Sequence, residues 1–206
     1  MIVFISGGAK SGKSLYAQRL AKKMQTPNKP LYYLATMIPT DNEDEKRISL
    51  HQKEREGYGF KTVEAGRDIV AAIDGCDQNG TFLLDSMTAL LANEMFQPDG
   101  CVEQNAYKKI ADDLLEVVNS VNNIVIVSDF IYSDATLYDD LTESYRRGLA
   151  YVDKQTTRLS DVVIEACSGN HIIHKGAEII SELAHGIDKR LYNVIGNVFN
   201  NSCSKE

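Results

Sequence analysis

The sequence predicts an α/β domain of three layers, in which helices cover both faces of a mainly parallel central sheet. Short apolar runs alternate with longer segments of helical periodicity along most of the chain, and this alternation is typical of parallel strands joined by crossover helices. With 206 residues, of which 43% are hydrophobic, the chain has enough apolar surface for one such core. A glycine-rich loop also joins the first strand candidate to the first helix candidate.

That loop carries the most specific pattern in the chain. Residues 7–14 match the phosphate-binding pattern G-x-x-x-x-G-K-[ST] at every fixed position. They are Gly7, Gly8, Ala9, Lys10, Ser11, Gly12, Lys13 and Ser14. An apolar strand of residues 1–6 precedes the loop, and apolar residues at helical spacing follow it as far as Met24. A plain Gly/Ser turn with an unrelated lysine is the alternative, but the flanking strand and helix favour a P-loop NTPase-like (RecA-like) domain.

A loop of this kind holds a nucleoside triphosphate with backbone and side-chain donors. Its glycines let N–H groups point at the phosphates, and the N-terminus of the following helix adds a partial positive charge. We expect all eight loop residues to contact the nucleotide, with Lys13 reaching the β- and γ-phosphates and the Ser14 hydroxyl on Mg²⁺. The sequence therefore predicts ATP or GTP as a ligand and Mg²⁺ as the cofactor.

The next segments continue the alternation of strand and helix. Residues 31–36 are apolar and aromatic and predict the second strand. A charged amphipathic helix is expected over residues 41–55, and the glycines of residues 57–59 end it. We expect a short strand at residues 60–64 and a helix at residues 68–73.

The second half of the chain repeats this pattern. The segments expected to be helical have amphipathic spacing and are residues 87–96, 107–121 and 140–159. The segments expected to be strands are short and apolar and are residues 81–85, 123–128 and 161–167. Residues 171–175 are expected to pair with the last of these strands as a hairpin edge. We divide the chain into a catalytic domain, residues 1–175, and a partly helical C-terminal extension, residues 176–206, with a mobile tail.

Composition excludes several classes of function. The net charge of −7, with no long basic run, argues against a nucleic-acid partner. The four cysteines form no C-x-x-C pair, so neither a zinc site nor a disulfide framework is indicated. No apolar run approaches the roughly 20 residues that span a bilayer, and Met1 leads straight into the first strand. We therefore expect a cytoplasmic protein with no membrane partner.

Asp85 ends an apolar strand well after the P-loop. In P-loop domains such an acid commonly supports Mg²⁺ beside the loop hydroxyl, here that of Ser14. The alternative is that Asp85 caps the N-terminus of the helix that follows. The position of Asp85 at the end of a buried strand favours the metal role.

A second cluster of polar residues follows the second strand. Glu43, Arg47, His51 and Arg55 are four residues apart and are expected to share one face of a helix. Alone, such a face is most often a solvated row of ion pairs. The second strand would, however, deliver this helix to the nucleotide side of the sheet, where a neutral histidine is a competent nucleophile toward phosphorus. Arg47 and Arg55 are then candidate phosphate contacts.

Several further segments match a known pattern at specific spacings. They are Tyr33-Leu34-Ala35-Thr36, then Asp41-x-Glu43-x-x-x-Arg47-Ile48-x-x-His51-x-x-x-Arg55, then Thr62-x-Glu64, then Leu84-Asp85-Ser86-Met87-Thr88 and Asn93. Together with the P-loop they resemble the bifunctional adenosylcobinamide kinase/adenosylcobinamide-phosphate guanylyltransferase family. The resemblance is dense over residues 1–96 and thinner afterwards, although residues 146–163 keep the family's register.

The resemblance implies an enzyme of cobalamin biosynthesis with two activities. Members of this family phosphorylate the aminopropanol hydroxyl of adenosylcobinamide and then transfer GMP from GTP to the product, giving adenosylcobinamide-GDP. A guanylylated histidine carries the GMP, and by resemblance that residue is His51. Glu64 is a candidate for nucleoside recognition. The resemblance also implies a homo-oligomer, a trimer.

The chain departs from the family pattern in its second half. Ser128-Asp129-Phe130-Ile131 stands where the family has Asn-Glu-Val-Gly, Asp153-Lys154 replaces an Asn-Gln pair, and Phe60 replaces a tryptophan. Three interpretations remain open: a bifunctional enzyme, a member with one activity or another acceptor, and a nucleotide-sensing regulatory protein. The sequence assigns neither the nucleotide of the kinase step nor the residues that bind the corrinoid.

Overall fold

The computed structural model describes residues 1–184, except for the side chains of Arg47, Glu182 and Ala184. The strands are β1 (Ile2–Gly7), β2 (Leu31–Ala35), β3 (Phe60–Glu64), β4 (Thr81–Asp85), β5 (Asn123–Asp129), β6 (Val162–Cys167) and β7 (Asn170–Lys175). The helices are α1 (Lys13–Met24), α2 (Asn42–Glu54), α3 (Ile69–Ile73), α4 (Met87–Met95), α5 (Ala106–Ser120), α6 (Asp140–Leu159) and α7 (Ala177–Ala184).

The strands form one seven-stranded sheet in the order β3-β2-β4-β5-β1-β6-β7. Every pairing is parallel except that of β7 with β6, which is antiparallel as expected for the hairpin edge. In parallel sheets the loops after the strands gather at the carboxyl edge, where ligands bind. β1, β5 and β4 are neighbours, so the P-loop and the ends of these strands meet at this edge.

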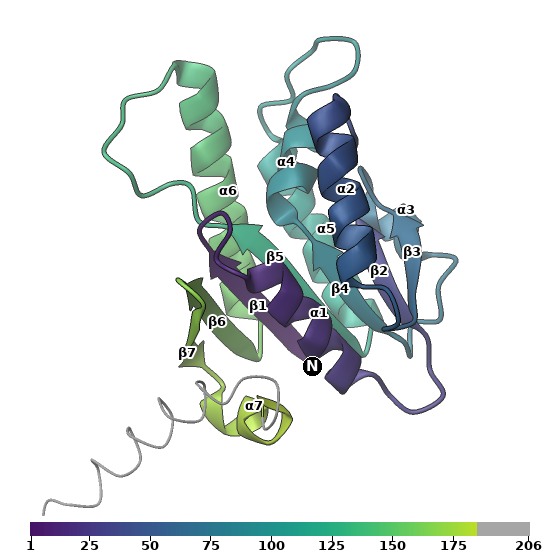
Figure 1. The fold of residues 1–206 in the computed structure, drawn as a ribbon. Helices are drawn as coiled ribbons and strands as arrows, with labels where there is room; N and C mark the ends of the chain where they lie inside the picture. Colours follow the sequence, from purple (N-terminus) through teal and green to yellow (C-terminus); the bar gives the residue numbers. More distant parts are fainter. Residues whose placement is uncertain (185–206) are drawn as a thin grey trace, which may run out of the picture.

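Successive side chains of the central strands point to opposite faces of the sheet and pack into two hydrophobic clusters, one on each face. Val3 and Ile5 of β1 pack with Leu20 of α1, and Phe4 packs on the opposite face with Ile110 of α5 and residues of α6. Figure 1 shows α1 and α6 on opposite sides of the sheet. The expected α/β domain of three layers is confirmed.

The expected elements agree with the observed ones to within one or two residues at most ends. Helix α6, residues 140–159, and strand β4, residues 81–85, have the expected bounds. In the extension, α7 packs Ile180 into the cluster that contains α1. The mobile tail expected near the C-terminus lies outside the described residues. Within residues 1–184, no helix combines the length and the apolar character needed to cross a bilayer.

Helix α2 differs from the other helices that flank the sheet. Its mean hydropathy is low because charged residues occupy most of its length. Asp41 caps its N-terminus by accepting the N–H groups of Glu43 and Asp44. Among the described residues, none of α2 belongs to either hydrophobic cluster. Polar and stacking contacts therefore carry much of its attachment to the domain.

Candidate active site

The backbone of the P-loop (residues 7–14) depends on two glycines. A Cβ atom on Gly7 would lie 2.4 Å from the carbonyl oxygen of Ala166 on β6, so only glycine fits there. Gly12 adopts a left-handed φ of +88° at the N-cap of α1, a conformation that side chains disfavour. Gly8, Ala9 and Lys10 are exposed. The loop therefore presents its outer residues to solvent at the helix N-terminus, as an anion site requires.

Lys13 is held across this loop by an acid from the neighbouring strand. Its Nζ atom lies 2.5 Å from Oδ1 of Asp129 and donates a hydrogen bond to the Gly8 carbonyl at 3.2 Å. Asp129 ends β5 and is the register partner of Gly7. Sequence reasoning did not assign Asp129 to the site. The signal was available, because Asp129 ends a buried strand just as Asp85 does.

Asp85 connects the P-loop to a second region. Ser14 Oγ donates to Oδ1 of Asp85 at 3.4 Å, and the Tyr33 hydroxyl donates to Oδ2 at 3.1 Å. Burial raises the pKa of Asp85, while the nearby His51 opposes that rise. The alternative role of Asp85 as a helix cap is wrong, because Ser86 is the N-cap of α4 and accepts the Ala89 N–H.

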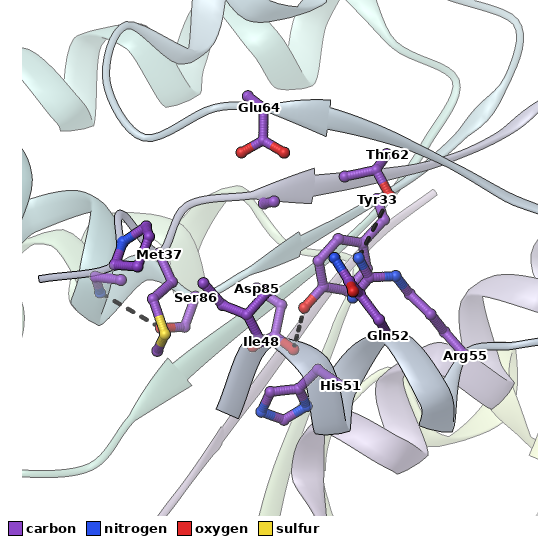
Figure 2. A pocket seen from close by; sticks show the side chains of 13 residues that line it. Tyr33, Met37, Ile48, His51, Gln52, Arg55, Thr62, Glu64, Asp85 and Ser86 are labelled. Atoms are coloured by element: carbon purple, nitrogen blue, oxygen red, sulfur yellow. Dashed lines mark hydrogen bonds between the residues drawn. The ribbon is translucent and has the colours of Figure 1, made fainter. Parts of the chain in front are cut away.

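Beyond Asp85 lies a cavity of about 280 Å³, which we call the His51 cavity. Strands β2, β3 and β4 form one wall and helix α2 the other, and Figure 2 shows Tyr33 between Asp85 and Arg55. The lining residues are Tyr33, Ala35, Met37, Pro39, Ile48, His51, Gln52, Arg55, Thr62, Glu64, Asp85, Ser86 and Ala89. The volume suits part of a nucleotide, with both polar and apolar surface.

Arg55 is layered into the wall of this cavity and is only 8% exposed. Its guanidinium carbon lies 4.0 Å from the centre of the Tyr33 ring, and Nη2 donates to Thr62 Oγ1 at 3.3 Å. Burial raises the pKa of Tyr33, and the negative charge of Asp85 adds to the rise. Tyr33 therefore stays protonated and donates to Asp85. The stack also joins the C-terminal end of α2 to the sheet.

His51 enters the cavity from α2, with 33% of its side chain exposed. Its Nδ1 atom lies 3.2 Å from Oε2 of Glu54. The expected helix face is only partly correct: Ile48, His51 and Arg55 line the cavity, whereas Glu43 is exposed. Four residues turn an α-helix by about 400°, which is about 40° more than a full turn, so residues spaced by four shift gradually around the helix. Glu43, the first of the row, therefore no longer points to the cavity. The Arg47 side chain lies outside the described residues.

Glu64 ends β3 and lines the same cavity. The structure thus brings His51, Arg55, Glu64 and Asp85 to one cavity and joins it through Asp85 to Ser14.

Thr36 and Asn93 belong to the sequence pattern described above, which gave them no role, and the structure shows that they brace this cavity. Thr36 Oγ1 donates to the Ser86 carbonyl at 2.8 Å and accepts the Ser86 N–H at 2.7 Å. Asn93 donates to the carbonyls of Thr36 and Gly66 at 2.7 and 2.9 Å. These bonds tie the ends of β2 and β3 to α4. Thr36 and Asn93 are visible in the sequence, but their partners are set by tertiary packing.

The site offers limited ligands to a metal ion. Within residues 1–184, no group of three or more His, Cys, Asp or Glu side chains is placed to hold a metal on its own. Ser14 and Asp85 do bring two hard oxygens together. That donor set fits Mg²⁺, which keeps waters and substrate phosphates as its other ligands.

The chain matches a family model described as cobinamide kinase / cobinamide phosphate guanyltransferase over residues 3–173. It is 30% identical, over 101 residues, to the bifunctional adenosylcobalamin biosynthesis protein CobU of Escherichia coli (strain K12). Those residues cover 48% of this chain and 53% of the relative, so the match spans about half the length of that protein.

Solved structures show weaker similarity. The KaiC-like protein PH0186 from Pyrococcus horikoshii OT3 has a TM-score of 0.47 and 12% identity, covering 84% of this chain and 78% of its own. The flagellar accessory protein FlaH from Methanocaldococcus jannaschii has a TM-score of 0.46 and 14% identity, covering 84% and 77%.

Proposed function

This chain belongs to the cobinamide kinase / cobinamide phosphate guanyltransferase family, and from that premise we propose that it has both activities in cobalamin biosynthesis. In the first, an NTP phosphorylates adenosylcobinamide. In the second, GMP passes from GTP through His51 to adenosylcobinamide phosphate, giving adenosylcobinamide-GDP. The proposal depends on one observation: Asp85 contacts Ser14 of the P-loop and also lines the His51 cavity, so the two sites adjoin.

The kinase step depends on charge and position. The loop amides and Lys13 hold the β- and γ-phosphates, and Ser14 and Asp85 hold Mg²⁺. When bound, Mg²⁺ supplies positive charge that offsets the charge of the phosphates. Lys13 exchanges its contact with Asp129 for the nucleotide, because the phosphates carry more negative charge than a single carboxylate.

The guanylyl step uses His51 as a covalent carrier. The carboxylate of Glu54, 3.2 Å from Nδ1, favours a proton on that nitrogen and leaves the lone pair of Nε2 available. A bond forms from Nε2 to the α-phosphorus as the bond to the β-phosphate breaks, and pyrophosphate leaves. A phosphate oxygen of the corrinoid then displaces the histidine. Arg55 on the cavity wall stabilises the negative charge that develops on the phosphate oxygens during the transfer. Glu64 contacts the nucleoside.

Two other functions remain as alternatives: a member with a single activity or another acceptor, and a nucleotide-sensing protein. His51 and Arg55 inside a cavity, rather than on a solvated helix face, favour the bifunctional enzyme. The family also leads us to propose a homotrimer acting in the cytoplasm on free GTP, ATP and corrinoid.

Labelling with α-³²P GTP and Mg²⁺, followed by mass spectrometry, tests this function. The wild-type chain should carry GMP on His51. His51→Ala should carry none but still phosphorylate adenosylcobinamide, because phosphoryl transfer needs no covalent carrier. His174 is an exposed histidine on β7, so His174→Ala is the matched control and should be labelled fully. An adduct on His171, His174 or His185, or full guanylyl transfer by His51→Ala, would contradict the mechanism.

A further inference from the structure

We propose that Asp129 is the base of the kinase step and that its carboxylate accepts the proton of the acceptor hydroxyl. This inference rests on the proposed function and adds a catalytic residue to it. In the register given above, Asp129 stands where the family pattern has Glu, whereas its neighbours Ser128, Phe130 and Ile131 depart from that pattern.

The position of Asp129 follows from the sheet. β5 lies between β4 and β1, so its carboxyl end lies between Asp85 and the P-loop. Asp129 pairs in register with Gly7, whereas Asp85 pairs with Val127 of the same strand. Asp85 contacts Ser14, and Asp129 contacts Lys13. The register with Gly7 places Asp129 beside the P-loop, and the loop lysine that reaches the β- and γ-phosphates is within contact of it. The short reach of Lys13 from Asp129 to those phosphates puts the carboxylate near the γ-phosphate.

The two acids differ in what occupies their oxygens. Both oxygens of Asp85 accept hydrogen bonds, from Ser14 and Tyr33. Asp129 uses Oδ1 for Lys13, and within residues 1–184 its Oδ2 has no hydrogen-bonding partner. The side chain of Asp129 is 27% exposed, against 9% for Lys13. An acceptor from solvent therefore reaches Asp129.

The backbone around Asp129 is fixed, as a positioned base requires. Its N–H donates to Thr88 Oγ1 at 2.9 Å, and the N–H of Phe130 donates to the Gly7 carbonyl at 3.0 Å. Among the residues that the structure describes, the ionisable groups that interact with it are Lys13 from α1, and Asp153 and Tyr145 from α6. Only Lys13 is cationic, and nucleotide binding draws it toward the phosphates.

The chemical step balances without a further reactant. The acceptor is an alcohol, whose O–H proton passes to Oδ2 of Asp129. Its oxygen forms a bond to the γ-phosphorus as the bond from that phosphorus to the β–γ bridging oxygen breaks. The nucleoside diphosphate leaves with the electron pair, and Lys13 and the loop amides hold its charge. Asp129 then returns the proton to solvent.

Asp129→Asn separates this role from a purely structural one, because the amide keeps the shape of the carboxylate but cannot act as a base. With ATP and adenosylcobinamide, kcat of the kinase step should fall about 10²-fold or more. ATP affinity should not weaken, since a negative charge beside the phosphates is removed. Asp129→Glu should recover part of the rate, and the acidic limb of the pH profile of kcat should disappear in Asp129→Asn.

Two controls make the result decisive. Asp112→Asn changes an exposed acid on α5 and should leave the rate unchanged. GMP labelling of His51 in Asp129→Asn should persist and report an intact fold. A kcat within a few-fold of wild type, or an unchanged acidic limb, would overturn the role of Asp129 while leaving the proposed function intact. A wild-type chain that labels His51 but never phosphorylates the corrinoid would overturn the kinase activity and the role together.

Discussion

The P-loop and the His51 cavity lie on either side of Asp85 but are built in different ways. The P-loop is eight consecutive residues whose shape depends on the close approach of Gly7 and the left-handed Gly12. The cavity takes its lining from three strands and two helices. A phosphate site made from backbone donors is thus encoded locally, whereas a site made from side chains depends on how distant segments pack.

The two regions also differ in how firmly they are held. Helix α1 packs Tyr16, Leu20 and Met24 into a hydrophobic cluster. Helix α2, which carries His51, has no such anchor among its described residues and is joined to the sheet through the stack of Arg55 on Tyr33. Segments with few buried apolar contacts open at lower free energy. We therefore expect α2 to exchange its amide hydrogens faster than α1.

Lys13→Ala should give the largest effect and shows whether the two regions share one nucleotide site. Loss of the cation that meets the phosphates should lower kinase turnover by about 10²-fold or more. If GTP for the second step uses the same loop, GMP labelling of His51 should fall in parallel. Steady-state rates and labelling yields measure both effects.

Lys22→Ala, at an exposed lysine near the end of α1, is the control for Lys13→Ala. Labelling that stays at the wild-type level while kinase turnover collapses would mean that the cavity binds GTP independently of the P-loop. Near-normal kinase turnover by Lys13→Ala would remove the P-loop from the reaction.

Asp85→Asn tests the residue that the two regions have in common. The amide should raise the Mg²⁺ concentration that gives half-maximal kinase activity by roughly 10-fold. Ser86 already caps α4, so the fold should be kept. A magnesium titration beside Asp74→Asn, an exposed acid after α3, measures the shift. Identical titration curves would leave Asp85 with only its hydrogen bonds to Ser14 and Tyr33.

Asp153→Asn should have the smallest effect on turnover. We expect it to change the free energy of unfolding instead, because Asp153 is buried near the end of β5. Asp153 is 2% exposed and accepts hydrogen bonds from Ser128 and Tyr132. Burial raises its pKa to about 7, and Asp129 adds to the rise. The folded state therefore binds the proton more tightly than the unfolded state. That stabilisation is complete below the unfolded pKa of about 4 and is lost as pH rises through about 7.

Asn mimics the protonated acid at every pH, so the variant and wild type should have similar stability near pH 4. Above pH 7 the variant should be more stable, by at most roughly 4 kcal/mol. Thermal unfolding at pH 5 and pH 8 measures this. A wild-type Tm that rises from pH 5 to pH 8 relative to the variant would show that the buried acid is not penalised by ionisation.

The sequence predicted the parts of the molecule that depend on local pattern. The order of strands and helices, the P-loop and the hairpin of β7 followed from periodicity and glycine placement. That Ile48 faces the cavity could not be predicted without knowing how α2 is rotated about its own axis. The hydrogen bonds of Thr36 and Asn93 could not be predicted because they depend on how the ends of β2 and β3 pack against α4. Asp129 was missed although it ends a buried strand just as Asp85 does, and the sheet register with Gly7 then shows that it lies beside the P-loop.

Ser14 and Tyr33 hold opposite oxygens of a single carboxylate on Asp85. The consequence is evolutionary. A substitution at Ser14 or Asp85 changes the carboxylate to which Tyr33 donates, and Tyr33 in turn stacks on Arg55 in the cavity wall. We therefore expect that, in related chains, changes in the P-loop and changes in the His51 cavity occur together.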